Sequence, residues 1–167
     1  DNKIIASRLE ALREEMRREH LSAFLFPSSD PHMREYVPSR WEGRKWISGF
    51  DGSAGTAVVT LHSAALWTDS RYFIAAEQQL AGTEFQLMRE RLDDTPTIPE
   101  WIAQETKDGD STEVGVDGMC MALSEVEDMK AELKLLGGLT MRTNLDILER
   151  VWTDRPSVPS DKLNIQP

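Results

Sequence analysis

The chain has 167 residues, of which 40% are hydrophobic and 29% charged, and its formal net charge is −10. A single domain of this length buries roughly 70% of the surface of its unfolded chain. The negative charge argues against binding to nucleic acid or to anionic membranes, because both depend on Lys and Arg side chains that pair with phosphates.

The cysteine content and the N-terminus indicate the compartment. Cys120 is the single cysteine, so an internal disulfide is excluded and a reducing compartment is favoured. Residues 1–20 are charged and amphipathic, unlike a signal peptide, and no run approaches the roughly 18 apolar residues that a membrane helix needs. We therefore expect a soluble, cytoplasmic protein.

The first third of the chain predicts a helix, a strand and a loop. Apolar residues recur at helical spacing over residues 4–19 and predict an amphipathic helix. Residues 23–26 read as a short buried strand that ends at Pro27. Residues 32–45 have no clear period, and we interpret them as a loop with at most one helical turn.

The middle third predicts a hairpin followed by a helix. Residues 55–60 and 64–68 read as two strands, and the short segment between them favours a hairpin. Asp69 or Ser70 can cap the next helix, whose apolar residues fall on one face. Residues 85–88 are a further strand candidate.

The last third contains two capping boxes, which mark helix starts. Thr97 with Glu100 opens a helix that ends near residue 109, and Ser124 with Glu127 opens another. The second helix ends at residues 137–138. Its predicted apolar stripe consists of Val126, Met129, Leu133 and Leu136. Residues 114–116 and 139–142 read as strands, and residues 147–152 as a short helix.

Helices alternate with strands throughout, which predicts an α/β fold with three layers, a β-sheet between helices. The hairpin makes this sheet mixed rather than purely parallel. Residues 1–155 form the predicted domain. Residues 156–167 are rich in proline and polar residues, and we interpret them as an exit linker towards a following domain absent from this chain.

A glycine loop between two apolar runs is the most informative segment. Gly49, Gly52 and Gly55 recur at every third position, with Asp51 and Ser53 between them. A generic core does not need this combination, so we expect the segment to present groups to something outside the domain. A phosphate cradle is disfavoured, because the spacing is not that of a dinucleotide fingerprint and a strand follows the loop.

The sequence does not favour a catalytic role for Ser53 or for the histidines. The hydrolase elbow requires a glycine where Asp51 stands, and no pattern ties His20, His32 or His62 to Ser53. A hydroxyl that stabilises the turn is the favoured role for Ser53. No metal-ligand spacing is present, so we expect no metal site in these residues.

Asp69 and Arg71 admit two interpretations. In the first, Asp69 is a helix cap and Arg71 a surface residue or the partner in an ion pair. In the second, Arg71 leans over the glycine loop and holds a carbonyl or carboxylate of a ligand with its planar fork. The sequence favours the first.

The five tryptophans divide into two groups. Trp67 and Trp101 lie in apolar or amphipathic elements and are predicted core residues. Trp41, Trp46 and Trp152 flank loops or the linker, where docking onto another domain is expected.

Residues 48–57, Ser-Gly-Phe-Asp-Gly-Ser-Ala-Gly-Thr-Ala, resemble the N-terminal domain of aminopeptidase P (Xaa-Pro aminopeptidase) of the long, three-domain type, in the creatinase/prolidase N-terminal family. Further stretches agree in order and approximate spacing: residues 27–32 with 35–36, 66–73, 94–97, 114–117 and 151–156. The resemblance therefore covers nearly the whole chain and implies a creatinase N-terminal-like, three-layer α/β domain.

The resemblance also implies an activity for the parent protein. Members of this family remove the N-terminal residue of peptides with proline at the second position. Their C-terminal domain holds two divalent metal ions, usually manganese, through two Asp, one His and two Glu. No residue of this chain matches those ligands, so the fragment is expected to hold no catalytic residue, no metal and no activity of its own.

Arg71 carries over as a substrate-binding residue. It stands where the family motif Trp-Thr-Asp-Gly-Arg-Tyr-Phe places an arginine, with Ser70 in place of the usual glycine. Asp51, Gly52 and Ser53 are expected to face the cleft. The resemblance further implies contacts with the downstream domains and a homo-oligomer.

Two rival functions stay open. The first is a peptidase-like binding or interaction module that lacks catalysis. The second is a creatinase or prolidase relative that acts on another C–N bond, although the Asp-Gly-Ser-Ala-Gly and Trp-Thr-Asp-Arg-Pro runs favour aminopeptidase P.

Overall fold

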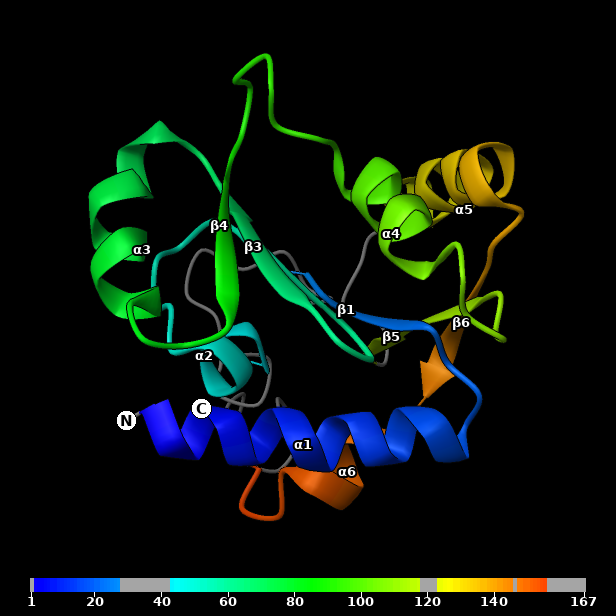
Figure 1. Cartoon of the computed structure of the whole chain (residues 1–167), viewed down its shortest axis with the longest axis horizontal. Coiled ribbons are helices and arrows are strands. Elements are labelled where there is room, and N and C mark those ends of the chain that lie inside the picture. Colours follow the sequence, from blue (N-terminus) through cyan, green and yellow to red (C-terminus); the bar gives the residue numbers. More distant parts are fainter. Residues whose placement is uncertain (1, 28–42, 118–122, 146, 156–167) are drawn as a thin grey trace, which may run out of the picture.

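A six-stranded sheet lies between two layers of helices (Figure 1). The computed structural model describes residues 2–27, 43–117, 123–145 and 147–155. In chain order the elements are α1 (Asn2–Arg18), β1 (Ala23–Phe26), α2 (Gly43–Ser48), β2 (Thr56–Thr60), β3 (Ala64–Thr68), the 3-10 helix η2 (Ser70–Tyr72), α3 (Phe73–Leu80), β4 (Phe85–Arg89), α4 (Ile98–Thr106), β5 (Glu113–Asp117), α5 (Leu123–Gly137), β6 (Thr140–Leu145) and α6 (Ile147–Val151).

The sheet is mixed, in the order β4-β3-β2-β1-β5-β6. β2 runs antiparallel to both of its neighbours, β1 and β3, whereas the pairs β1–β5, β3–β4 and β5–β6 are parallel. The predicted hairpin is therefore confirmed, as are the mixed sheet and the α/β class. None of the helices formed by the described residues has the length and apolar character needed to cross a bilayer.

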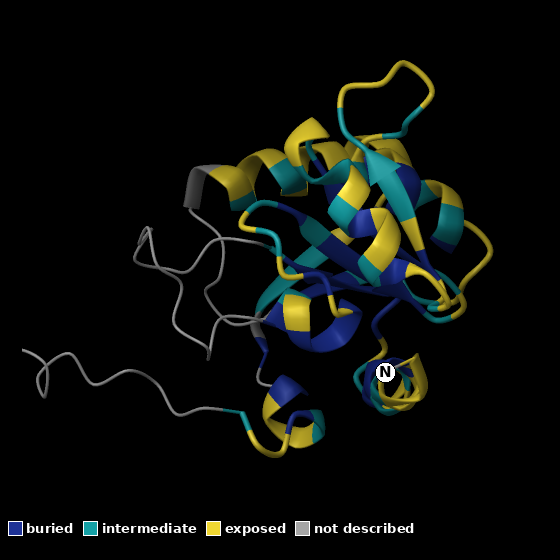
Figure 2. Ribbon diagram, turned by 90° about the vertical axis from the view of Figure 1, so that its left-hand side faces the viewer, coloured by how far each residue is buried: buried dark blue, intermediate teal, exposed yellow. Residues whose placement is uncertain are grey.

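Alternation along the strands divides the core into two clusters. In β1, Phe24 and Phe26 face one layer, and Ala23 and Leu25 face the other. The first layer consists of α1, α2, α3 and α6, and the second of α4 and α5. Figure 2 shows the central strands as buried, whereas the connection between β4 and α4 projects outward and is exposed.

The second layer bears out several predictions. Trp67 and Trp101 are 3% and 5% exposed and meet edge to face, with ring centroids 5.4 Å apart. The capping box of α4 is present, because Thr97 Oγ1 accepts from the Glu100 N–H at 3.3 Å and Glu100 Oε1 accepts from the Thr97 N–H at 2.8 Å. The side chain of Ser124 lies outside the described residues.

The apolar stripe predicted for α5 is wrong at its last position. Leu133 is fully buried, but Leu136 is 46% exposed. Leu136 lies in the last turn of α5, and Leu139, just beyond the helix, fills the second cluster in its place at 3% exposure.

Residues 32–45, interpreted as a loop with at most one helical turn, end in the first turn of α2, which continues to Ser48. This helix has six residues, too few to show a period, and tertiary packing holds it. Trp46 and Ile47 are buried in the first cluster, and a Cβ on Gly43 would lie 3.1 Å from the Phe26 ring. Residues 28–42, with His32 and Trp41, lie outside the described residues.

The docking role predicted for Trp46 and Trp152 is also wrong within this chain. Both side chains are 8% exposed, and their rings stack on each other with centroids 5.2 Å apart and planes 19° apart. Each ring buries the other, so neither offers a surface to a further domain.

Candidate functional site

The glycine loop and the segment after β3 lie at the same edge of the sheet. Thr56, at the start of β2, pairs with Trp67 near the end of β3, so residues 49–55 lie beside residues 69–72. Two contacts join the segments: Thr68 Oγ1 donates to the carbonyl of Ala54 at 2.7 Å, and the Ser53 and Tyr72 hydroxyls are hydrogen-bonded. The site is built from these two segments.

The conformation of the loop is set by Phe50 below it and Arg44 beside it. Phe50 is fully buried, and the Arg44 guanidinium carbon lies 5.3 Å from its ring centroid. Arg44 Nη1 donates to the carbonyl of Gly55 at 3.0 Å, and Nη2 donates to the carbonyl of Gly52. A Cβ on Gly52 would lie 2.3 Å from Phe50 Cζ, so glycine is required where the backbone crosses this ring.

Asp51 and Ser53 are exposed on the outer side of the loop, and both are anchored to the next segment. The Asp51 N–H donates to Gln79 Oε1 at 3.1 Å, and Gln79 Nε2 donates to Asp51 Oδ1 at 2.8 Å. Ser53 bonds Tyr72, whose ring lies edge to face with Phe50 at 6.1 Å. These contacts give Ser53 the turn-stabilising role expected from the sequence.

Asp69 caps η2 and pairs with Arg71, as the first interpretation predicted. Asp69 Oδ1 accepts from the backbone N–H and from Nε of Arg71, both at 3.0 Å, and Oδ2 accepts from Nη2 at 2.9 Å. Hydrogen bonds from Arg71 lower the pKa of the Asp69 carboxyl. The Arg71 side chain is 66% exposed, and its guanidinium lies 5.0 Å from the Tyr72 ring centroid.

A second carboxylate lies close to this ion pair. Glu90 follows β4, and its N–H donates to the carbonyl of Thr68 at 3.0 Å. Burial raises the pKa of Glu90, the charge of Asp69 raises it further, and Arg91 opposes the shift. The ends of β3 and β4 therefore place carboxylates and guanidinium groups together. A ligand carboxylate or carbonyl would compete with Asp69 for the fork of Arg71.

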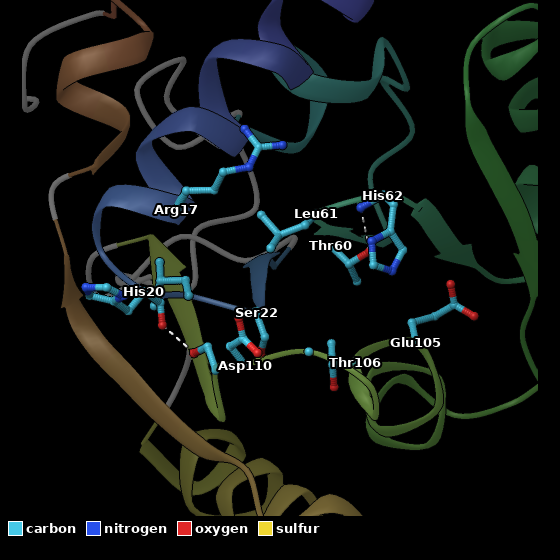
Figure 3. Close-up of a pocket in the computed structure, with 12 residues that line it drawn as sticks. Arg17, His20, Ser22, Thr60, Leu61, His62, Glu105, Thr106 and Asp110 are labelled. Carbon is cyan, nitrogen blue, oxygen red and sulfur yellow. Dashed lines mark hydrogen bonds between the residues drawn. The ribbon is translucent and has the colours of Figure 1, made fainter.

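A cavity of about 310 Å³ lies at the opposite end of β2, around the hairpin turn (Figure 3). Its lining includes His20, at the end of α1, and His62, in the turn. Both histidines are thus separated from Ser53 by the length of β2, and neither can serve it as a base. Figure 3 also shows Glu105 and His62 on the same side of this cavity, which contains none of the predicted site residues.

Metal ligands do not gather in the described part of the chain. Within residues 2–27, 43–117, 123–145 and 147–155, no three His, Cys, Asp or Glu side chains form a group that could hold a metal ion. The resemblance implies a pair of divalent ions in the C-terminal domain of the family, not among these residues. The chemistry available to the side chains at the glycine loop is hydrogen bonding and charge pairing.

The sequence model of the creatinase/prolidase N-terminal domain matches residues 8–143. The chain belongs to this family. The match begins within α1 and ends within β6, so it includes strands β1 to β5, most of β6 and both segments of the site.

Relatives of this creatinase/prolidase N-terminal domain carry peptidase names. The chain is 39% identical to Xaa-Pro aminopeptidase 2 of Rattus norvegicus over 96% of its own length and 23% of that protein. It is 38% identical to a probable Xaa-Pro aminopeptidase P of Tuber melanosporum, over 95% of the chain and 26% of that protein. The chain thus spans about a quarter of the length of these curated relatives.

Solved structures agree with the fold. X-prolyl aminopeptidase from Caenorhabditis elegans, a cytosolic enzyme with a di-nuclear active site, matches with a TM-score of 0.81 and 30% identity, over 93% of this chain and 26% of that one. The N-terminal domain of the cytoplasmic peptidase PepQ from Mycobacterium tuberculosis matches with a TM-score of 0.62 and 20% identity, over 87% of this chain and 98% of that one. At 20% identity, the match to the PepQ domain shows a shared fold and no more.

Sequence reasoning missed three residues that shape the site: Arg44, Tyr72 and Gln79. Arg44 lies in a segment interpreted as loop, and no local pattern marks an arginine that bonds carbonyls 8 and 11 residues away. Tyr72 follows Arg71 directly, and its polar tip could have been paired with the exposed hydroxyl of Ser53. Gln79 lies on α3, 28 residues from its partner Asp51, with no signal in the sequence.

Proposed function

We propose that this chain is the N-terminal, non-catalytic domain of a metal-dependent Xaa-Pro aminopeptidase, a hydrolase that removes the N-terminal residue preceding proline. Two divalent metal ions, manganese in the family resemblance, are held by a downstream domain. The domain described here shapes substrate access and contributes to contacts in a homo-oligomer. The parent enzyme is cytoplasmic and acts on peptides with proline at the second position.

The alignment with named peptidases supports this proposal. Relatives that match 95–96% of the chain are Xaa-Pro aminopeptidases, and the chain corresponds to about a quarter of each. The C. elegans enzyme, whose structure contains this fold, is cytosolic and has a di-nuclear active site. A division of labour follows, in which a separate part of the protein supplies the metal-bound nucleophile.

The observation that carries a substrate role is the geometry of Arg71. The Arg71 side chain is 66% exposed and its planar fork pairs with the Asp69 carboxylate, beside a loop that presents Asp51 and Ser53. A peptide carbonyl or carboxylate can replace Asp69 on the fork at little cost, because both arrangements keep charge-assisted hydrogen bonds. Arg71 would then orient the peptide, and residues 51–53 would border the entrance to the cleft.

A peptidase assay tests the division of labour. With added Mn²⁺ and an Xaa-Pro-Pro peptide, we expect turnover by the longer protein that contains this chain and none by the 167-residue chain. Turnover by the chain itself at enzyme-like rates would overturn the proposal. An inactive longer protein would favour the rival function of a binding module without catalysis.

Arg71→Ala in the longer protein tests the substrate role. Loss of one or two charge-assisted hydrogen bonds should lower kcat/KM roughly 10- to 100-fold. Stability should change little, because an exposed ion pair contributes little to it. Arg18→Ala is the matched control, since Arg18 is 62% exposed and pairs with Glu15 away from the site. Unaltered kinetics for Arg71→Ala would leave Arg71 a structural role alone.

A further inference from the structure

The short helix α2 contacts two parts of the domain that are far apart in the sequence. Arg44 bonds the glycine loop, and Trp46 stacks on Trp152, 106 residues further along the chain. Residues two apart on a helix point to nearly opposite sides. One helix of six residues therefore holds the loop on one side and the exit segment (residues 147–155) on the other.

The exit segment is held firmly against α2 and α1. Trp152 is 8% exposed, and the Arg155 guanidinium lies 5.1 Å from its ring centroid, with the Arg155 side chain 3% exposed. On the α2 side, Arg8 Nη1 donates to the carbonyl of Trp46 at 2.6 Å and its guanidinium lies 5.0 Å from the Trp46 ring centroid. The stack is thus flanked by cations that favour one arrangement of the two rings.

On its other side, α2 determines where the loop runs. Arg44 donates to two loop carbonyls, and Ser48 Oγ accepts from the Phe50 N–H at 3.1 Å. A helix of this length has no stability of its own, because helix nucleation is costly and its hydrogen bonds are few. Its position depends on the contacts that it makes, so loosening the Trp46 contact also loosens Arg44 and Ser48.

We infer that α2 couples the glycine loop to the exit segment, with Arg44 and Trp46 as positioning residues for the loop. The functional consequence rests on the proposed function: residues 152–155 precede the part that the relatives have beyond this chain, so the placement of that part reaches the loop beside Arg71. The coupling itself is a property of this chain and does not depend on catalysis.

Amide hydrogen exchange of the chain tests the coupling. The N–H groups of Phe50 and Asp51 donate to Ser48 and Gln79, and their exchange rates report on the loop. Trp152→Leu removes the stacked ring, and we expect exchange over residues 43–55 to accelerate about tenfold, the effect of losing an aromatic pair. Trp152→Phe restores a ring and should recover most of the protection.

Trp101→Leu is the matched control, because it removes a comparable aromatic pair from the other face of the sheet. It should leave the exchange of residues 43–55 unchanged relative to the sheet. If Trp152→Leu accelerates exchange in residues 147–155 alone, or accelerates it everywhere as a loss of global stability would, the coupling is overturned.

Arg44→Lys tests the same coupling from the loop side and removes no aromatic core residue. Coupling is reciprocal, so loss of the arginine fork should accelerate exchange at Phe50 and Asp51 and also at Trp152, whose N–H donates to the Leu148 carbonyl at 2.8 Å. Faster exchange in the loop with Trp152 unchanged would overturn the inference. An inactive longer protein would count against the proposed function and leave these exchange results unaffected.

Discussion

The two ends of β2 are held in the same way, but they differ in the polar groups that they expose. At the hairpin turn, Arg13 of α1 donates through Nε to the Thr60 carbonyl at 2.8 Å and through Nη2 to the Ser63 carbonyl at 3.0 Å. At the glycine loop, Arg44 of α2 donates to the carbonyls of Gly55 and Gly52. In both places one guanidinium from a helix of the first layer gathers two backbone carbonyls.

The hairpin end is complete in itself. Glu84 accepts from Arg13 Nη1 and Nη2 at 2.9 and 2.6 Å and balances its charge. Thr60 Oγ1 accepts from the Ser63 N–H at 3.0 Å and closes the turn without any glycine. A connection between two strands needs no more than this, so the hairpin shows what folding alone requires.

The loop end has features that folding does not require. It uses seven residues where the hairpin uses three, it crosses a buried aromatic ring on glycine, and it holds Asp51 and Ser53 in exposed positions. Beside it, Arg71 is exposed and Glu90 has a raised pKa. Perturbed and exposed polar groups gathered beside a glycine-rich loop are typical of functional sites, which supports the proposal of a site at this end of the sheet.

Gly52→Ala should produce the largest effect on stability and would show how closely the loop fits Phe50. The added Cβ would lie 2.3 Å from Phe50 Cζ, so the loop or the ring must move. We expect a loss of about 2–3 kcal/mol, or roughly 5–10 °C in Tm, from overpacking. Gly109→Ala is the control, since its Cβ would lie 3.4 Å from the Thr106 carbonyl, an ordinary contact. Equal Tm values for the two variants would show that the loop is not closely packed.

The same contrast separates what could be predicted from the sequence from what could not. The hairpin, the α4 capping box and the Asp69 cap depend on residues within a few positions of one another, and the sequence predicts them correctly. The three glycines of the loop also lie within a few positions of one another, and their spacing marks the candidate site. Local signals therefore predicted the fold class correctly and marked the candidate site.

What the sequence did not predict depends on long-range contacts. α2 is too short to show a period, and it forms because Trp46 stacks on Trp152 and Ile47 enters the core. The partners Ser53–Tyr72 and Asp51–Gln79 are 19 and 28 positions apart, and no periodicity links them. The exposed position of Leu136 depends on Leu139 filling the core instead.

Thr68→Val and Thr60→Val make the same substitution at the two ends of β2, one beside the glycine loop and one at the hairpin turn. Both side chains are nearly fully buried, at 0% and 1% exposure, and each hydroxyl serves one turn. Each variant should lose about 1–2 kcal/mol, because a backbone group loses its partner: the Ala54 carbonyl in one and the Ser63 N–H in the other.

Kinetics of the longer protein then separate the two threonine variants. Thr68→Val should lower kcat/KM by about three- to tenfold, since the loop loses its bond to β3, while Thr60→Val should leave it unchanged. Equal kinetic effects at both ends would contradict the assignment of function to the glycine loop.

The smallest expected effects on stability concern two glutamates, Glu19 on the hairpin side of the domain and Glu90 on the side of the glycine loop. Hydrogen bonding from Arg150 lowers the pKa of Glu19 below its ordinary 4.5, so folding favours its charged form. That stabilisation is present above about pH 4.5 and is lost as the pH falls through the lowered pKa. Burial raises the pKa of Glu90 above 4.5, so its charged form costs stability above the raised pKa and costs nothing below 4.5.

Glu19→Gln should therefore lower Tm at pH 7 and Glu90→Gln should raise it, each by roughly 1–3 °C. Thermal unfolding from pH 7 to pH 3 measures both, and each difference from the unmodified chain should shrink towards the acid end. Tm shifts of the same sign for the two variants, or Tm shifts that do not depend on pH, would contradict the opposite roles of the two glutamates. With the expected signs, the Glu19 end is optimised for stability, whereas the Glu90 end sacrifices some stability to keep a carboxylate beside Asp69 and Arg71, as a binding site does.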